Sequence, residues 1–271
     1  MYQGFYNLAS GMLTQSRNLN VISNNMVNVQ TAGYKHDTMV TSTFQEEMLY
    51  RTGKRNKENP VELGTTSKIK TASRTYVNYE QGSFEQTDGI YDFALEDKGF
   101  FCIQTSNGDL RYTRNGAFSV DQEGYLVLND QGRVLSTDDQ PIQIDNEDFT
   151  VDENGKITAV ITTGGGSEDS EVQTETREYG TLKVVDFADY DQLHKEDNGL
   201  FSTTQTPIQT DSESETGSVP ILWKCLEKSN VDMVEEMTAM MSSQRALQSA
   251  AQMLKMYDQI MSKSSTDVGR L

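Results

Sequence analysis

The sequence predicts an α+β protein, in which helices from the two ends of the chain pair as a coiled-coil-like domain and the middle forms a mainly antiparallel β domain. Three observations predict this class. They are a seven-residue apolar repeat near each end of the 271 residues, glycine turns through the middle, and a charge confined to that middle.

Near the start of the chain, apolar residues recur seven apart, and a second row follows three residues later with only Gln15 breaking it. The members are Phe5, Leu8, Met12, Leu19, Ile22, Met26 and Val29. A period of 3.5 residues gives a helix a narrow stripe that suits another helix. We therefore expect residues 1–34 to be the N-terminal helix of an assembly domain.

The same spacing returns near the end of the chain, where we expect the second helix of that domain over residues 223–271. Its members are Leu226, Met233, Met237, Met240, Leu247, Ala251, Leu254 and Met261. Methionine is flexible and suits an interface with several slightly different neighbours. The alternative is that both helices are amphipathic and lie on the central domain, although that packing usually needs a broader apolar face.

The middle of the chain, residues 73–222, is expected to form the β domain. Gly108, Gly116, Gly124 and Gly132 stand eight residues apart, between short runs of β-type composition. Asn-Gly and similar pairs are hairpin signals, so this stretch predicts an antiparallel meander.

Two further β stretches are expected over 149–163, with a turn at Asn154-Gly155, and over 180–187 with 199–204. Residues 164–178 and 210–218 lack apolar periodicity and predict solvated loops. Residues 35–72 predict an extended connecting segment with a short helix around Phe44 to Leu49.

The formal net charge is −18, and the excess of acidic residues that causes it lies entirely in the middle of the chain. Residues 1–72 carry a net +3, residues 73–222 a net −21, and residues 223–271 a net 0. Nucleic-acid binding needs a basic surface, so we expect no nucleic-acid partner. The near-neutral ends are where association is expected.

Chemical motifs are sparse. The two histidines, His36 and His194, are expected at the surface, Cys102 is expected to be buried and inert, and Cys225 exposed at the head of the last helix. No metal-binding, phosphate-binding or nucleophile motif is present, so we expect no catalytic residue, no metal, no cofactor and no small-molecule substrate. Mean hydropathy is −0.62, no apolar run is long enough to span a membrane, and the start of the chain does not read as a cleaved signal peptide.

Three stretches together carry a resemblance to a known family. They are ISNNMVNVQTAGYK (22–35), YEQGSFEQTDGIYDFALEDKGFFCIQTSNGDLRYTRNGAFSVDQEGYLVL (79–128) and EKSNVDMVEEMTAMMSSQRALQSAAQMLKMYDQIM (227–261). In this order they resemble the bacterial flagellar axial proteins of the rod and hook branch.

The resemblance implies a non-enzymatic structural subunit of the flagellar basal-body rod, proximal or distal, that assembles into a helical tube through its terminal helices and transmits torque for motility. It implies copies of the chain and other rod and hook proteins as partners, and export through the flagellar type III apparatus. The alternatives are a hook-type protein or, in a different class, an acidic extracellular binding module with a coiled-coil stalk.

The motifs also predict individual roles. Asn24, Asn25 and Asn28 compete for backbone hydrogen bonds in an isolated helix, but buried between helices they fix register. Gly33 is expected to end the helix in a left-handed conformation.

In the C-terminal motif, Ser229, next to Asn230, is expected to cap a first helical turn that contains Asp232. Gln244 and Arg245 are expected to make contacts between helices or between subunits.

Overall fold

The computed structural model describes residues 2–51, 61–129, 131–146, 148–163, 173–196, 198–210 and 219–268. The chain divides into two compact units. The helical unit comprises Met1–Val27, His36–Asn78 and Val231–Leu271, and the β unit comprises Asn28–Lys35 and Tyr79–Asn230. Paired terminal helices and central antiparallel sheets confirm the predicted α+β class. Whether the four predicted segments behave as separate domains stays a prediction.

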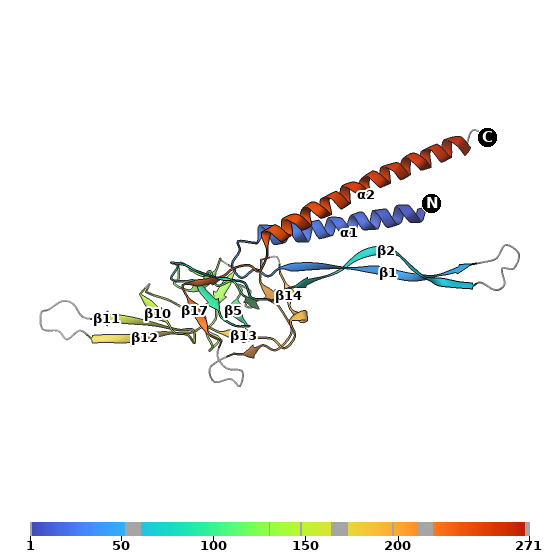
Figure 1. Cartoon of the computed structure of the whole chain (residues 1–271). Helices are drawn as coiled ribbons and strands as arrows, with labels where there is room; N and C mark the ends of the chain where they lie inside the picture. Colours follow the sequence, from blue (N-terminus) through green and yellow to red (C-terminus); the bar gives the residue numbers. More distant parts are fainter. Residues whose placement is uncertain are drawn as a thin grey trace. The chain divides into compact units, whose positions relative to one another are not determined.

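The helical unit contains two long helices, α1 (Tyr2–Val27) and α2 (Met233–Val268), which pack along one another. Figure 1 shows the N-terminus of the chain beside the far end of α2, so the two helices run antiparallel. Neither described helix is both long and apolar enough to cross a membrane.

A two-stranded antiparallel ribbon completes the helical unit and also packs against α1. Its strands are β1 (Asp37–Arg51) and β2 (Val61–Val77), and the register shifts twice along their length (Figure 1). The prediction of a short helix around Phe44 to Leu49 is wrong, because these residues pair with β2 along the ribbon. Residues 37–51 and 61–72 of the predicted extended segment lie in the strands of this ribbon.

The second helix begins later than its apolar repeat predicts. Residues 221–227 form two short strands, so Leu226 lies in a sheet and Ser229 does not cap the helix. The cap is Asp232, whose Oδ1 accepts hydrogen bonds from the backbone N–H groups of Val234 (2.8 Å) and Glu235 (3.3 Å). A carboxylate at this position satisfies two otherwise unpaired donors and interacts favourably with the helix dipole.

The β unit is made of short strands and one 3₁₀ turn (Tyr190–Gln192). The strands are β3 (Phe84–Gln86), β4 (Phe93–Leu95), β5 (Phe100–Gln104), β6 (Leu110–Thr113), β7 (Ser119–Val120), β8 (Leu126–Leu128), β9 (Gly132–Val134), β10 (Phe149–Val151), β11 (Lys156–Thr163), β12 (Gln173–Thr181), β13 (Val184–Asp186), β14 (His194–Lys195), β15 (Phe201–Ser202), β16 (Ile208–Gln209), β17 (Ile221–Trp223) and β18 (Cys225–Glu227).

The largest sheet has the order β14-β15-β6-β5-β9-β8-β7, with β13 pairing to both β5 and β16. The prediction of a simple meander is wrong in one respect. The hairpin β5–β6 forms as expected, but β9 returns to pair with the other edge of β5 instead of continuing outward from β6. Strand β5 therefore lies inside the sheet, and four of its five residues are buried.

A second sheet has the order β10-β11-β12, and the predicted turn at Asn154-Gly155 joins its first two strands with Gly155 at φ +76°. The prediction of a loop over 164–178 is wrong for residues 173–178, which belong to β12. Residues 164–172 and 211–218, where loops were also expected, lie outside the described residues.

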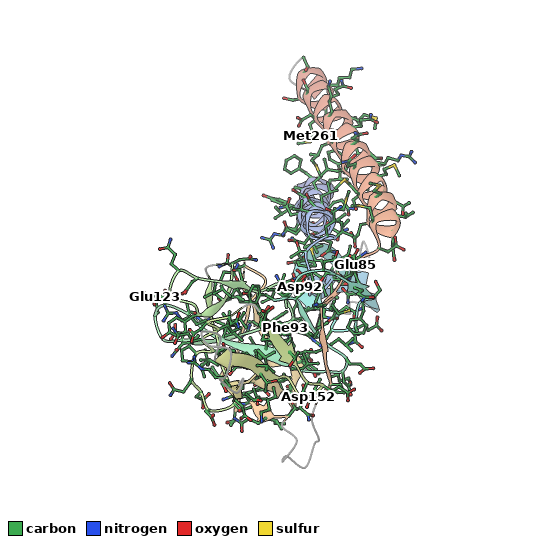
Figure 2. All side chains as sticks on the ribbon, turned by 90° about the vertical axis from the view of Figure 1, so that its left-hand side faces the viewer. Glu85, Asp92, Phe93, Glu123, Asp152 and Met261 are labelled. Carbon is green, nitrogen blue, oxygen red and sulfur yellow. The ribbon has the colours of Figure 1, made fainter. Side chains whose placement is uncertain are left out.

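The core of the β unit gathers buried apolar side chains from its sheets, including the small sheets β17–β4 and β18–β3. Figure 2 shows Phe93 of β4 within this unit, with Glu123 and Asp152 towards its rim. Phe93 is completely buried, whereas both acids are exposed. The acidic composition of the middle of the chain is therefore displayed at the surface of a well-packed core.

Four glycines spaced eight residues apart serve two physical purposes. Gly108 (φ +87°) and Gly124 (φ +85°) adopt the left-handed conformation that turns require. Gly116 and Gly132 instead allow close backbone approach, because a Cβ would lie 1.7 Å from the Phe93 carbonyl oxygen and 2.7 Å from that of Gln104, respectively.

Gly11 in α1 offers a direct test of the helical unit. A Cβ at this position meets nothing within 4 Å, so Gly11→Ala should stabilise the helical unit by about 1 kcal/mol through helix propensity alone. At Gly4 a Cβ would lie 2.7 Å from the Tyr257 hydroxyl, so Gly4→Ala should gain less. Thermal unfolding followed by circular dichroism at 222 nm measures both, and a lower stability for Gly11→Ala would contradict this packing.

Cys102 tests the interior of the β unit. Burial raises the pKa of its thiol from 9.0 to about 11. Because the unfolded chain loses this proton first, the free energy of unfolding should fall as pH rises from 9 to 11, by about 2 kcal/mol at pH 10.5. The measurement is denaturant unfolding at pH 8 and 10.5 of Cys225→Ser, compared with the same chain carrying Cys102→Ala. An equal pH dependence in both proteins would show that Cys102 is not buried as described.

Candidate assembly site

Small and polar residues make specific contacts where α1 and α2 meet. The ideal Cβ position of Gly4 lies 2.7 Å from the Tyr257 hydroxyl, and Asn18 Nδ2 donates to Ser243 Oγ at 3.3 Å. These contacts fix an antiparallel register in which the two residue numbers add to 261. In each helix the contacting residues are separated by multiples of seven, the spacing of a helix-to-helix seam.

The root of the helix pair is held by Asn25, which is buried. Its Nδ2 donates to the Asp37 carbonyl oxygen at 2.9 Å and its Oδ1 accepts from the Asp37 N–H at 3.0 Å. The same amide donates to Glu236 Oε1 at 3.2 Å. One side chain thus connects α1, the first residue of β1 and the first turn of α2.

Glu236 is itself buried and has a second partner, since His36 Nε2 donates to its Oε1 at 2.6 Å. The remaining oxygen, Oε2, is buried and has no hydrogen-bond partner among the residues that the structure describes. His36, expected at the surface, is half-buried with 26% of its side chain exposed, whereas His194 is exposed as expected.

The predicted seam residues flank this polar root. Among the predicted seam residues of α1, Ile22 is the buried one, and Phe5 is 41% exposed. The half-buried ones are Leu8, Met12, Leu19 and Met26. In α2, Met233, Met240, Leu247, Leu254 and Met261 are half-buried and Met237 is exposed. Val29 lies beyond the end of α1 and belongs to the β unit. Their role in assembly stays a prediction.

Of the other motif residues in this unit, Asn24 is exposed on α1, and Gln244 and Arg245 are exposed on α2. Figure 2 shows Met261 near the far end of α2.

The second half of the N-terminal motif belongs to the β unit. Asn28 Oδ1 accepts a hydrogen bond from Thr31 Oγ1 at 3.2 Å in the turn that follows α1. Gly33 is left-handed as predicted, with φ +67°, but it lies six residues beyond the last residue of α1. A Cβ on Gly33 would lie 2.3 Å from the Arg114 carbonyl carbon, so close backbone approach also requires glycine here.

Next to Gly33, Lys35 forms a buried ion pair with Glu227 of β18, and Lys35 Nζ lies 2.6 Å from Glu227 Oε1. The side chains are each 1% exposed. Lys35 Nζ also donates to the Glu80 carbonyl oxygen at 2.8 Å, and Asn230 Nδ2 donates to the same oxygen at 3.0 Å.

Arg114 completes the cluster. Its Nη1 lies 3.5 Å from Glu227 Oε2 and donates to the Asp97 carbonyl oxygen at 2.8 Å. Burial lowers the pKa of both Lys35 and Arg114, and the negative charge of Glu227 opposes that shift. This ionic cluster, defined as Lys35, Arg114 and Glu227, thus holds two cations around one carboxylate.

Lys195 of β14 contacts the segment that contains Tyr34 and Lys35. Its Nζ donates to the Lys35 carbonyl oxygen at 2.8 Å and lies 3.7 Å from the centre of the Tyr34 ring. The Gly-aromatic-Lys end of the motif is therefore an anchor in the β unit, with each of its three residues buried.

The prediction that Cys102 is buried is confirmed, while Cys225 lies half-buried in β18 and not at the head of a helix. No group of three or more metal-ligating side chains occurs among the described residues.

Four buried charged residues were not predicted from the sequence, namely Lys35, Arg114, Glu227 and Glu236. Charged side chains are expected at the surface by default, and they become buried only when a partner neutralises them. One signal was available in the sequence. Lys35 ends the N-terminal motif, two residues after Gly33, and Glu227 begins the C-terminal motif, two residues before Ser229, and apolar periodicity explains neither charged residue.

The described residues thus form paired terminal helices and an acidic β unit, the architecture expected of a rod subunit. Three family models match it in order: flagellar basal body rod protein at residues 5–35, flagellar hook protein FlgE/F/G D1 domain at residues 94–159, and flagellar basal body rod FlgEFG protein C-terminal at residues 224–267.

Full-length relatives agree. The flagellar basal-body rod protein FlgG of Bacillus subtilis is 30% identical over 96% of this chain and 97% of the relative. The flagellar hook-basal body complex protein FlhO of the same organism is 29% identical over 100% of both. FlgG of Buchnera aphidicola from Acyrthosiphon pisum is 28% identical over 94% of this chain and 96% of the relative.

The chain belongs to the flagellar basal-body rod protein family, and it is a non-enzymatic structural subunit of the basal-body rod. Proteins of this family assemble with other rod and hook subunits. This confirms the resemblance and the predicted function as a structural subunit of the basal-body rod.

Asn25 provides the test of the helix root. Asn25→Ala leaves the Asp37 backbone groups and Glu236 short of partners, so it should destabilise the helical unit by about 3 kcal/mol. Asn20→Ala, at an exposed position of α1, should change stability by less than about 0.5 kcal/mol. Circular dichroism at 222 nm measures the helices, and the fluorescence of Trp223 reports the β unit, which should stay folded in both variants. Equal effects of the two substitutions would contradict the assigned role.

Proposed function

We propose that this subunit polymerises with copies of itself, and joins other rod and hook subunits, through the outward faces of α1 and α2. The observation that supports the proposal is the exposure of large apolar side chains on both helices. They are Phe5, Tyr6 and Leu13 on α1, and Val234, Met237, Met241, Met253, Met256 and Ile260 on α2.

The pairing of the helices explains why these side chains are left over. Gly4, Asn18 and Asn25 meet Tyr257, Ser243 and Glu236. These three contacts between the helices involve small or polar groups, and the apolar side chains named above remain exposed. Contiguous apolar side chains at a surface mark an interaction site, and methionine adapts to neighbours that differ slightly in position.

Contacts between unlike surfaces of identical subunits produce a helical assembly when the rotation does not close into a ring. We therefore propose that residues 1–34 and 223–271 supply the assembly domain of a helical tube that transmits torque for motility. The predicted seam residues of α1 and α2, the exposed motif residues Asn24, Gln244 and Arg245, and the exposed apolar residues together form its contact surfaces.

The β domain, proposed as residues 73–222, contributes differently. Its net charge of −21 opposes close packing of β domains with one another and keeps unassembled subunits apart. Association then depends on the near-neutral helices, whose apolar contacts are not screened by salt. The family resemblance further supports export through the flagellar type III apparatus and a place in the proximal or distal rod.

Met256 tests the proposed contact surface. Met256→Glu places a charge in an apolar contact, and the desolvation of that charge should weaken self-association at least about 100-fold. The matched control Gln122→Glu adds the same charge at an exposed position of the β unit, outside the proposed contact surface, and should assemble normally. Sedimentation velocity at increasing protein concentration measures association, and soft-agar motility of cells carrying each variant measures function.

Circular dichroism should show that both variants keep their helices, because Met256 is 54% exposed in the subunit. Normal self-association and motility with Met256→Glu would refute the proposed surface.

A further inference from the structure

The β unit is assembled from two separate stretches, residues 28–35 and 79–230, so the chain enters or leaves it at four places. Backbone and side-chain contacts around Glu227 connect these places. The Gly33 N–H donates to the Glu227 carbonyl oxygen at 2.7 Å, and the Gly82 N–H donates to Glu227 Oε1 at 3.0 Å. The Lys228 N–H donates to the Ser83 carbonyl oxygen at 2.8 Å.

The ionic cluster at this junction is unbalanced in charge. Glu227 is the carboxylate that lies within 4 Å of both Lys35 and Arg114 among the described residues. Asp97 and Asp186 also act on Arg114, but more weakly than Glu227 does. Without Glu227, two buried cations would face each other in an interior that cannot solvate them.

The order of these residues along the chain is the second observation. Both cations, Lys35 and Arg114, precede the carboxylate in the sequence. Glu227 is the last residue of β18, the last strand of the β unit, so all the other strands precede it.

We propose that Glu227 is a folding lock: the β unit becomes stable only when this carboxylate neutralises Lys35 and Arg114, so that a chain lacking its last segment cannot form a finished β unit. This goes beyond the assembly of the rod, because it concerns which chains become competent to assemble. It also assigns the Lys at the end of the N-terminal motif a partner close to the start of the C-terminal motif.

The lock makes an asymmetric prediction. Glu227→Gln keeps the shape of the side chain but leaves two buried cations without their anion. Lys35→Met removes one cation and leaves Glu227 opposite Arg114. Glu227→Gln should therefore lower the stability of the β unit far more than Lys35→Met does. The double variant, which lacks both the anion and the Lys35 cation, should be more stable than Glu227→Gln alone.

The experiment compares four full-length proteins: the native chain, Lys35→Met, Glu227→Gln, and the double variant. The readout is thermal unfolding followed by the fluorescence of Trp223, the single tryptophan, whose Nε1 donates to the Ile90 carbonyl oxygen within the β unit. We expect Glu227→Gln to lower Tm by roughly 10 °C, Lys35→Met by less than half of that, and the double variant to regain several degrees over Glu227→Gln.

The matched control is Glu85→Gln. Glu85 pairs with Lys228 at 3.0 Å on the surface of the same unit, with its side chain 56% exposed, so its loss should shift Tm by no more than about 2 °C. A similar small shift for Glu227→Gln, or a double variant less stable than Glu227→Gln, would overturn the lock. If Glu227→Gln does not fold at all, a folded double variant supports the lock and an unfolded one overturns it.

Discussion

The burial of one carboxylate, Glu227, is the constraint on which the β unit depends. Its backbone receives the Gly33 N–H, and its side chain meets Lys35, Arg114 and the Gly82 N–H. A buried ion pair is weak evidence for stability by itself, but the loss of one partner is costly. The cluster therefore acts mainly through specificity: segments from both ends of the sequence must be present together for any of these charges to be tolerated.

The helical unit solves a different problem, because its helices must pair with each other and still remain able to bind neighbours. Small and polar residues at the pairing surface, such as Gly4, Asn18 and Ser243, allow the helices to approach closely. The amide of Asn25 then sets the register at the root, since it is the group that matches both the Asp37 backbone and Glu236. Methionine and isoleucine on the outer faces stay exposed in the subunit.

Much of this fold follows from the sequence for physical reasons that are local. The seven-residue repeats predict both helices, and glycine turns predict the hairpins, because these signals depend on nearby residues only. The same locality explains the errors. Nothing near Phe44 shows that it pairs with a strand more than twenty residues away, and nothing near β9 shows that it returns to β5.

The residues at which the two helices meet could not all be predicted, for a related reason. The motif asparagines were expected between helices, yet Asn25 is buried there while Asn24 is exposed. Periodicity identifies a face of a helix but does not decide which neighbouring row is innermost. The row through Asn18 and Asn25 makes hydrogen bonds to α2, although the predicted rows are the apolar ones. Lys35 and Glu227 pair with each other although they are 192 residues apart in sequence, so only the folded chain could reveal the pair.

The structure of the assembled rod, determined by cryo-electron microscopy of basal bodies that carry this chain, would show directly which surfaces of the subunit are in contact. We expect Met253, Met256 and Ile260 to lie within about 4.5 Å of a helix of a neighbouring subunit, while Asn25 still bonds to Glu236 within its own subunit. A rod in which these apolar side chains face open solvent, or in which α1 and α2 of one subunit have separated, would rule out assembly through these helix faces.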